Sequence, residues 1–158
     1  MSNTLAKRSD PVNQWVTFRL GEEIYGVNVM QVQEVLRISE IAPVPGAPDY
    51  VVGIINLRGN VVTVIDTRTR FGLLPKEPDD ASRIVVIEAD DQVIGILVDS
   101  VAEVVELRAS EIESPPSVGN EDSTRYIQGV TSCNGALLIL VDLNQFLNDE
   151  DKAVLDQL

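Results

Sequence analysis

Apolar and polar residues alternate along most of this chain in short runs, the period of β-strands that bury one face. Gln14 to Leu20 forms one such run, and after the turn residues Gly21-Glu22-Glu23 a second run extends from Ile24 to Val29. These two runs predict a β-hairpin. Val32 to Ile38 predicts a third strand, with one or two helical turns over Met30 to Leu36 as the alternative.

Turn and breaker residues divide the next segment. Ala42 to Pro48 contains three prolines and predicts a rigid loop, because proline excludes a helix there. Val51 to Leu57 and Val61 to Ile65 then predict a second hairpin. Asp66 to Phe71 is expected to form a short helix with Asp66 as its N-cap and Gly72 as its end.

The whole order of elements then returns in a second copy. Gly26 recurs 69 residues later as Gly95, and Gly53 recurs 76 residues later as Gly129, each within a matching stretch of sequence. Two collinear matches indicate an internal duplication. The second copy predicts strands over 83–88, 93–98 and 101–107, and a hairpin over 127–141 across Asn134-Gly135, a strong hairpin-turn signal.

This pattern predicts an all-β fold of two side-by-side five-stranded barrels, with short helices after each hairpin and at the C-terminus. Neither copy, at roughly 65 residues, buries a large core alone, so the two are expected to share an apolar interior. The expected divisions are a flexible tail over 1–13, a first barrel over 14–74, a linker over 75–82, a second barrel over 83–148 and an amphipathic helix over 149–158.

The composition of the chain disfavours several classes of function. Twelve basic and 25 acidic residues give a net charge of −13, which repels nucleic-acid backbones and anionic lipid. No apolar run approaches the length of a membrane span, and Met1 to Pro11 has no signal-peptide core, so we expect a cytoplasmic protein without direct membrane insertion. Cys133 is the single cysteine, which fits a reducing compartment.

The chain contains no histidine, which removes the commonest general base and metal ligand. Glu34 recurs as Glu103, and these two carboxylates are the residues that could suggest the acid–base chemistry of a hydrolase. We interpret them as exposed strand residues or ion-pair partners, because no lysine cluster or ligand set completes a site. The expectation is therefore a protein without catalytic residues, metal or cofactor.

The segment Tyr50 to Arg68, which contains Gly53-Ile54-Ile55-Asn56-Leu57-Arg58-Gly59, resembles the family of bacterial chemotaxis coupling proteins called CheW. Tyr25-Gly26-Val27 and Val32-Gln33-Glu34-Val35 precede it, and the resemblance covers about residues 14 to 150. It implies two SH3-like barrels around a shared interior. It also implies a scaffold that joins the cytoplasmic tips of chemoreceptors to the regulatory domain of the histidine kinase CheA in membrane-associated arrays.

The same resemblance implies two contact surfaces. The receptor tip is expected in a groove between the barrels, at Val32, Glu34, Gly53, Arg58, Gly95, Val101, Val104 and Gly129. The kinase is expected at a barrel end, at Ile38, Glu40, Ile41, Val44 and Pro45. In isolation the protein is expected to be a monomer, with weak ring contacts within arrays left open.

Arg58 stands where the second copy has Asn134, in the turn of the hairpin. Arginine accepts a positive φ less readily than asparagine, so an offsetting role is expected. We predict that its planar guanidinium faces a receptor and contacts carboxylate or carbonyl groups. The alternative is that the first-copy turn is of another type and Arg58 is a solvated hairpin residue.

Three readings compete with the receptor scaffold. A small-ligand or nucleic-acid barrel is disfavoured by the acidic charge and the lack of an aromatic face. A carboxylate hydrolase has no supporting motif. A coupling protein for a related chemosensory system, controlling surface motility or a second messenger, stays open. Val32, Val35, Val101 and Val104 likewise stay open between core residues and the lining of a docking groove.

Overall fold

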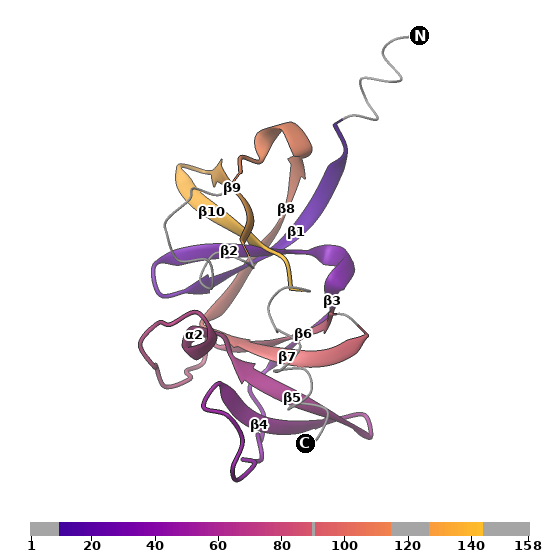
Figure 1. The fold of residues 1–158 in the computed structure, drawn as a ribbon, viewed down its shortest axis with the longest axis vertical. Coiled ribbons are helices and arrows are strands. Elements are labelled where there is room, and N and C mark those ends of the chain that lie inside the picture. The colour runs from indigo at the N-terminus through magenta and orange to yellow at the C-terminus, as the bar shows by residue number, and fades with distance from the viewer. Residues whose placement is uncertain (1–9, 90, 115–126, 144–158) are drawn as a thin grey trace.

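The structure is a computed structural model that describes residues 10–89, 91–114 and 127–143. Within these ranges the chain forms two five-stranded sheets, one above the other in Figure 1, with very little helix. The strands are β1 (Val12–Leu20), β2 (Glu23–Asn28), β3 (Val32–Arg37), β4 (Val51–Leu57), β5 (Asn60–Asp66), β6 (Arg83–Ala89), β7 (Gln92–Val98), β8 (Ser100–Arg108), β9 (Ile127–Cys133) and β10 (Ala136–Val141). The helices are α2 (Thr67–Arg70) and two 3-10 turns, η1 (Val29–Gln31) and η2 (Ala109–Glu111). The predicted all-β fold is confirmed.

Each sheet closes into a small barrel. Barrel A has the strand order β8-β1-β2-β10-β9, and barrel B has the order β3-β6-β7-β5-β4. Isolated bridges join the two edges of each sheet, between Glu113 and Val130 in barrel A and between Ala42 and Ile54 in barrel B. In the second bridge Ile54 N donates to Ala42 O at 2.8 Å, and Ala42 N donates to Ile54 O at 2.9 Å. The barrels therefore have equivalent closures, as the duplication requires.

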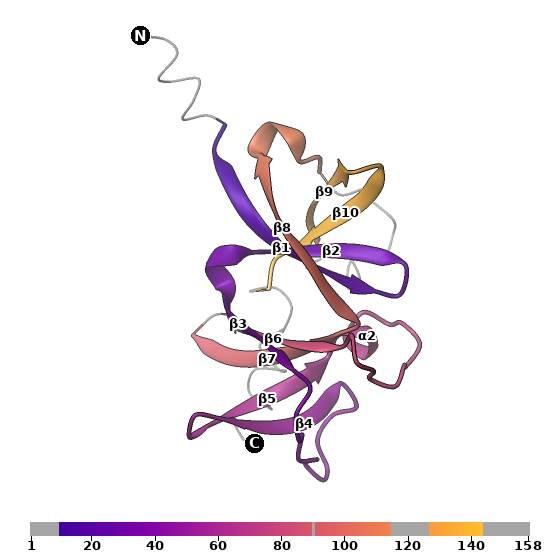
Figure 2. The same cartoon turned by 180° about the vertical axis from the view of Figure 1, so that it is seen from behind.

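The predicted barrel boundaries, 14–74 and 83–148, are wrong because each barrel takes strands from both copies. Barrel A combines β1 and β2 of the first copy with β8, β9 and β10 of the second, and barrel B combines β3, β4 and β5 with β6 and β7. The crossovers explain this exchange. A single residue, Asp99, separates β7 from β8, which is too short for a hairpin reversal, so β8 leaves its neighbour's sheet (Figure 2).

The predicted linker and tail also need correction. Residues 75–82 form no regular structure, as expected, yet they connect α2 to β6 within barrel B instead of joining two barrels. Residues 10–13 do not belong to a tail, because β1 begins at Val12 and Asp10 accepts hydrogen bonds from Ser110 N at 2.8 Å and Ser110 Oγ at 3.1 Å. The rest of the predicted tail and the helix over 149–158 lie outside the described residues.

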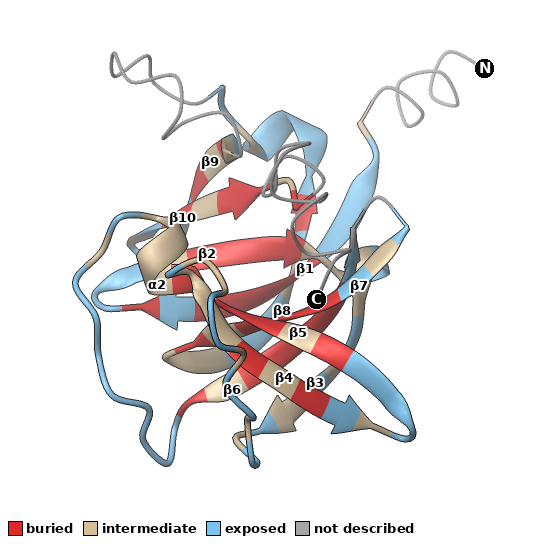
Figure 3. Ribbon diagram, turned by 60° about the horizontal axis from the view of Figure 1, so that its bottom comes forward, coloured by how far each residue is buried: buried red, intermediate tan, exposed pale blue. Residues whose placement is uncertain are grey.

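Three apolar clusters form the core. One fills barrel A around Trp15 and Leu138, and another fills barrel B around Val64 and Ile84. The largest lies between the barrels and combines residues of β1, β2, β5, β6 and β7, including the fully buried Phe18. Figure 3 shows this burial along the strands at the middle of the molecule. The predicted shared interior is confirmed.

The short elements follow from local sequence. Asp66 caps α2, since its carboxylate accepts a hydrogen bond from Arg68 N at 3.1 Å, as predicted. Gly72 follows with φ of +77°, a conformation that suits glycine at the end of a helix. Among the described residues, no helix has the length and apolar character that a membrane crossing needs.

Candidate functional site

Two of the predicted valines extend the shared core toward the surface on β3. In the antiparallel pairing of β3 with β6, Val32 lies opposite Ile87 and Val35 lies opposite Val85. Directly opposed residues point to the same face of a sheet, and both Ile87 and Val85 belong to the core between the barrels. Val32 is partly buried against that core, whereas Val35 is 41% exposed.

The matching valines on β8 show the same difference in burial. Val101 lies opposite Phe18 and Val104 opposite Val16, and both partners belong to the shared core. Val101 packs against the core, whereas Val104 is 53% exposed. Val35 and Val104 are therefore surface residues and not core. We call Val32, Val35, Val101 and Val104 the valine set: four apolar side chains on the inter-barrel faces of two equivalent strands.

Glu34, the residue before Val35 in β3, forms an ion pair with Arg58. A bulge in β3 lies between Val32 and Glu34, and the Glu34 carboxylate accepts hydrogen bonds from both terminal nitrogens of Arg58, one of them from Nη1 at 3.2 Å. This hydrogen bond lowers the pKa of Glu34 and raises the pKa of Arg58. The Arg58 side chain remains 69% exposed, against 26% for Glu34, so its outer face is open to a partner.

The Arg58-Gly59 turn has the same type as its counterpart. Arg58 and Gly59 have φ of +53° and +88°, and Asn134 and Gly135 have +53° and +81°, both typical of type I′ hairpins. The alternative of a different turn type is therefore wrong. Two contacts within the chain compensate for the poor turn propensity of arginine. Glu34 binds the Arg58 guanidinium, and Asn56 Oδ1 accepts a hydrogen bond from Gly59 N at 2.8 Å.

Arg58→Asn should separate the contribution of the turn to stability from the contribution of the ion pair. Asparagine accepts the positive φ at position 58 but cannot reach Glu34 as arginine does, and solvent screens an exposed ion pair. We expect the free energy of unfolding, measured by urea denaturation, to stay close to that of the unmodified protein. Arg58→Val is the matched control, because a β-branched residue at φ of +53° should be clearly destabilising. Equal losses from both substitutions would contradict this account.

The three glycines among the predicted site residues are buried. They allow neighbouring segments of the barrels to approach closely and do not form a contact surface. A Cβ on Gly53 would lie 2.2 Å from the carbonyl oxygen of Ala42, and one on Gly129 would lie 2.4 Å from Ile112 Cγ2. These are the two barrel-closing regions. Gly95 lies inside barrel B, where a Cβ would come within 2.7 Å of Ile84 Cγ2. Each glycine thus allows a close approach of strands.

The predicted kinase-contact residues lie on the segment between β3 and β4. Ile38 and Ile41 are partly buried against the interior of barrel B, Val44 is half-buried, and Glu40 and Pro45 are exposed. A surface depression of about 540 Å³ lies beside this segment. Its lining comprises Glu40, Ile41, Ala42, Ile54, Ile55, Asn56 and Val61. Val61, which sequence reasoning did not select, is 66% exposed.

Sequence reasoning missed a charged contact at the junction of the barrels. Asp99 accepts hydrogen bonds from Arg68 Nε at 2.8 Å and Nη2 at 2.6 Å, and from Gly21 N at 2.7 Å. Arg68 also donates to the carbonyl of Leu74 at 2.9 Å. The Arg68 hydrogen bonds lower the pKa of Asp99. This network joins the β1–β2 turn of barrel A to α2 of barrel B. Arg68 and Gly21 lie 31 and 78 positions from Asp99, so no local sequence pattern could identify them as its partners.

The site carries no sign of acid–base chemistry in the described part of the chain. Glu34 is engaged by Arg58, and no cluster of three or more histidine, cysteine, aspartate or glutamate side chains with metal-site geometry occurs among the described residues. What the described surface offers is two exposed valines, Val35 and Val104, and a cation, Arg58, presented by a rigid turn. Such a combination suits recognition of a protein partner.

Comparisons with known proteins agree with this picture. A family model described as the CheW-like domain matches residues 14–151. The chain is 33% identical over 147 residues to the chemotaxis protein CheW of Treponema pallidum (strain Nichols), covering 90% of this chain and 86% of that protein. It is 35% identical over 144 residues to the chemotaxis protein CheW of Bacillus subtilis (strain 168), covering 90% and 92%. The crystal structure of the scaffolding protein TtCheW from Thermoanaerobacter tengcongensis matches with a TM-score of 0.80 and 33% identity, covering 87% of this chain and 89% of that one.

Proposed function

This chain belongs to the CheW family of chemotaxis proteins, and from this premise we propose that it joins the cytoplasmic tips of chemoreceptors to the histidine kinase CheA. The coupling is non-enzymatic and takes place in membrane-associated receptor arrays. The observation that carries the proposal is the exposure of two members of the valine set, Val35 and Val104, and of the Arg58 guanidinium. An exposed apolar surface continuous with a packed core is suited to an amphipathic helix, the form in which a receptor tip presents itself.

Receptor and kinase use different parts of the molecule in this proposal. The receptor tip lies on the exposed members of the valine set, Val35 and Val104, and the outer face of Arg58 binds its polar groups. The kinase contacts the segment from Ile38 to Pro45 at barrel B. Simultaneous binding requires such separation, and weak individual contacts are strengthened by multivalency within an array.

Val104→Asp should weaken receptor binding without unfolding the protein. Val104 is 53% exposed, so a carboxylate there stays hydrated in the free protein but would be desolvated under an apolar helix face. We expect receptor affinity to fall at least about tenfold, and CheA affinity to stay unchanged. The measurement is sedimentation or pull-down with receptor-tip fragments and CheA from the same organism.

Leu137→Asp is the matched control, because Leu137 is also 53% exposed but lies on β10, outside the valine set. Arg58→Ala should weaken receptor binding in the same assay and leave the kinase bound. If Val104→Asp and Leu137→Asp behave alike, the valine set is not the receptor surface. Failure of the unmodified protein to bind either partner would point to a related chemosensory system.

A further inference from the structure

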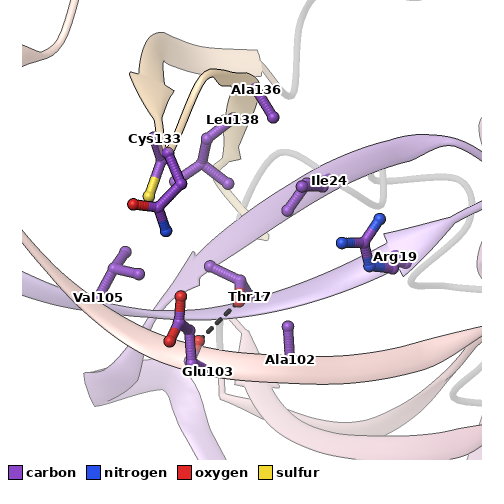
Figure 4. A pocket seen from close by; sticks show the side chains of 10 residues that line it. Thr17, Arg19, Ile24, Ala102, Glu103, Val105, Cys133, Ala136 and Leu138 are labelled. Atoms are coloured by element: carbon purple, nitrogen blue, oxygen red, sulfur yellow. Dashed lines mark hydrogen bonds between the residues drawn. The ribbon is translucent and has the colours of Figure 1, made fainter.

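Barrel A contains a cavity of about 170 Å³ at the end of the β9–β10 hairpin. Figure 4 shows Thr17, Glu103 and Cys133 among the side chains that line it. Asn134, Val105 and Leu138 also contribute to the lining. The cavity uses neither the valine set nor the segment from Ile38 to Pro45, so it is separate from both proposed contact surfaces.

The duplication identifies the equivalent place in barrel B. Both barrels carry a bulge at the same point, between Val32 and Glu34 in β3 and opposite Thr17 in the β1–β8 pair. Glu103 is the counterpart of Glu34, because both lie two residues after the valine that pairs with the shared core. Asn134 is the counterpart of Arg58, since both are first in the two-residue turn of equivalent hairpins.

In barrel B the equivalent place is filled by the chain itself. Leu36 and Leu57 pack against the barrel interior, and the Arg58 guanidinium lies on the Glu34 carboxylate. Barrel A has smaller side chains at every one of these positions: Val105 for Leu36, Cys133 for Leu57 and Asn134 for Arg58. The glutamate is kept, whereas the arginine and the two leucines are replaced. We attribute the cavity to the smaller side chains at these three positions.

Glu103 is well placed to receive a cation. Its side chain is exposed, and among the described residues its carboxylate has no hydrogen-bond or ion-pair partner, in contrast to Glu34. Its backbone is fixed, because Thr17 Oγ1 donates to Glu103 O at 2.6 Å. Arg19 also lines the cavity, but among the described residues its guanidinium forms no ion pair with Glu103. The net charge of −13 adds a long-range attraction for cations.

We propose that the barrel A cavity binds an arginine side chain of a partner protein, with Glu103 as its carboxylate acceptor. The guanidinium takes the position that Arg58 holds in barrel B, and its apolar stem packs against Val105 and Cys133. The planar fork of arginine matches a carboxylate through two parallel hydrogen bonds, which lysine cannot reproduce. This assigns a third contact point, independent of the receptor and kinase surfaces.

A titration followed by NMR tests the proposal directly. N-acetyl-arginine-N-methylamide is added to the full chain, with the lysine and citrulline analogues as comparison probes, and amide shifts are followed at Thr17, Ala102 and Ala136. We expect saturable millimolar binding of the arginine probe, with both analogues weaker by about tenfold. Glu103→Gln should weaken the arginine probe by a similar factor. Glu106→Gln, an exposed glutamate on the same strand, is the matched control.

Asn134→Arg supplies the missing arginine within the chain. Arg58 shows that arginine is accepted at φ of +53° in the equivalent turn. The variant should no longer bind the arginine probe, and its melting temperature should exceed that of the double variant Asn134→Arg/Glu103→Gln. The proposal is overturned if the arginine probe causes no saturable shifts, or if Glu103→Gln and Glu106→Gln bind it equally.

Discussion

Gly53→Ala is expected to lower the free energy of unfolding by about 3–5 kcal/mol, the largest effect that we predict. A Cβ at this position would lie 2.2 Å from Ala42 O and 2.8 Å from Ile41 Cγ2. Ala42 O accepts the hydrogen bond from Ile54 N that closes barrel B. A backbone carbonyl in a closing bridge cannot move aside without breaking it. Urea denaturation monitored by circular dichroism measures the change.

Gly129→Ala is the matched comparison, because Gly129 occupies the equivalent position in barrel A. There the first contact is a methyl group, Ile112 Cγ2 at 2.4 Å, while the nearest backbone oxygen, Glu113 O, is 3.1 Å away. A side chain can change rotamer, so we expect a loss of about 1–2 kcal/mol, less than for Gly53→Ala. A Gly53→Ala protein as stable as the unmodified chain would show that the Ala42–Ile54 bridge does not close the barrel in solution.

Asp99→Asn is expected to cost about 2 kcal/mol at neutral pH, because it removes the charge from a largely buried ion pair. The Arg68 and Asp99 side chains are only 15% and 18% exposed. The amide oxygen of asparagine still accepts from Gly21 N, so the substitution tests the charge and keeps the turn contact. The loss should appear in urea denaturation at neutral pH.

The pH dependence of this loss has a definite sign. Arg68 lowers the pKa of Asp99 below its value in the unfolded chain, so the ionised carboxylate stabilises the folded state above the unfolded pKa. That stabilisation is lost as the pH falls through the lowered, folded-state pKa. The stabilities of the unmodified protein and Asp99→Asn should therefore converge in acid. A difference that does not depend on pH would exclude the ion pair as its cause.

Asp79→Asn provides the control for this experiment. Asp79 also binds a cation, Lys76 at 2.9 Å, but the two side chains are 55% and 40% exposed. Solvent screens such a pair, so we expect the free energy of unfolding to change much less than it does for Asp99→Asn. The comparison separates the effect of a junction between barrels from the general effect of removing a carboxylate.

Local patterns predicted the strands well, and the reason is visible at particular residues. The apolar run within Gln14 to Leu20 predicted β1, although both faces of this strand are buried, with Trp15 in the barrel A cluster and Phe18 in the shared core. Asn134-Gly135 forms the expected type I′ turn. Asp66 caps α2 because a carboxylate at that position satisfies a free backbone N–H. Predictions of this kind depend on contacts within a few residues.

The candidate site was predicted only in part. The valines and Arg58 followed from the family resemblance; of these, Val104 and Arg58 are exposed, whereas Val32 and Val101 pack against the shared core. The three glycines prove to be buried at points of close strand approach. The Glu34–Arg58 pair bridges 24 positions and the Arg68–Asp99 pair bridges 31, so neither has a local signal.

The sequence by itself determined that this protein is a duplicated, acidic, all-β chain of the CheW type, because the alternation, the turns and the repeated glycines are local features. Only the tertiary structure decided which strands pair. Two copies with the same pattern can pair within each copy or across them, and the residues facing the core are the same in both cases. The single residue Asp99 between β7 and β8 favours exchange. This exchange of strands produces the shared core and the exposed valines at the edges of that core. It also places the cavity in barrel A at the position where barrel B holds Arg58 on Glu34.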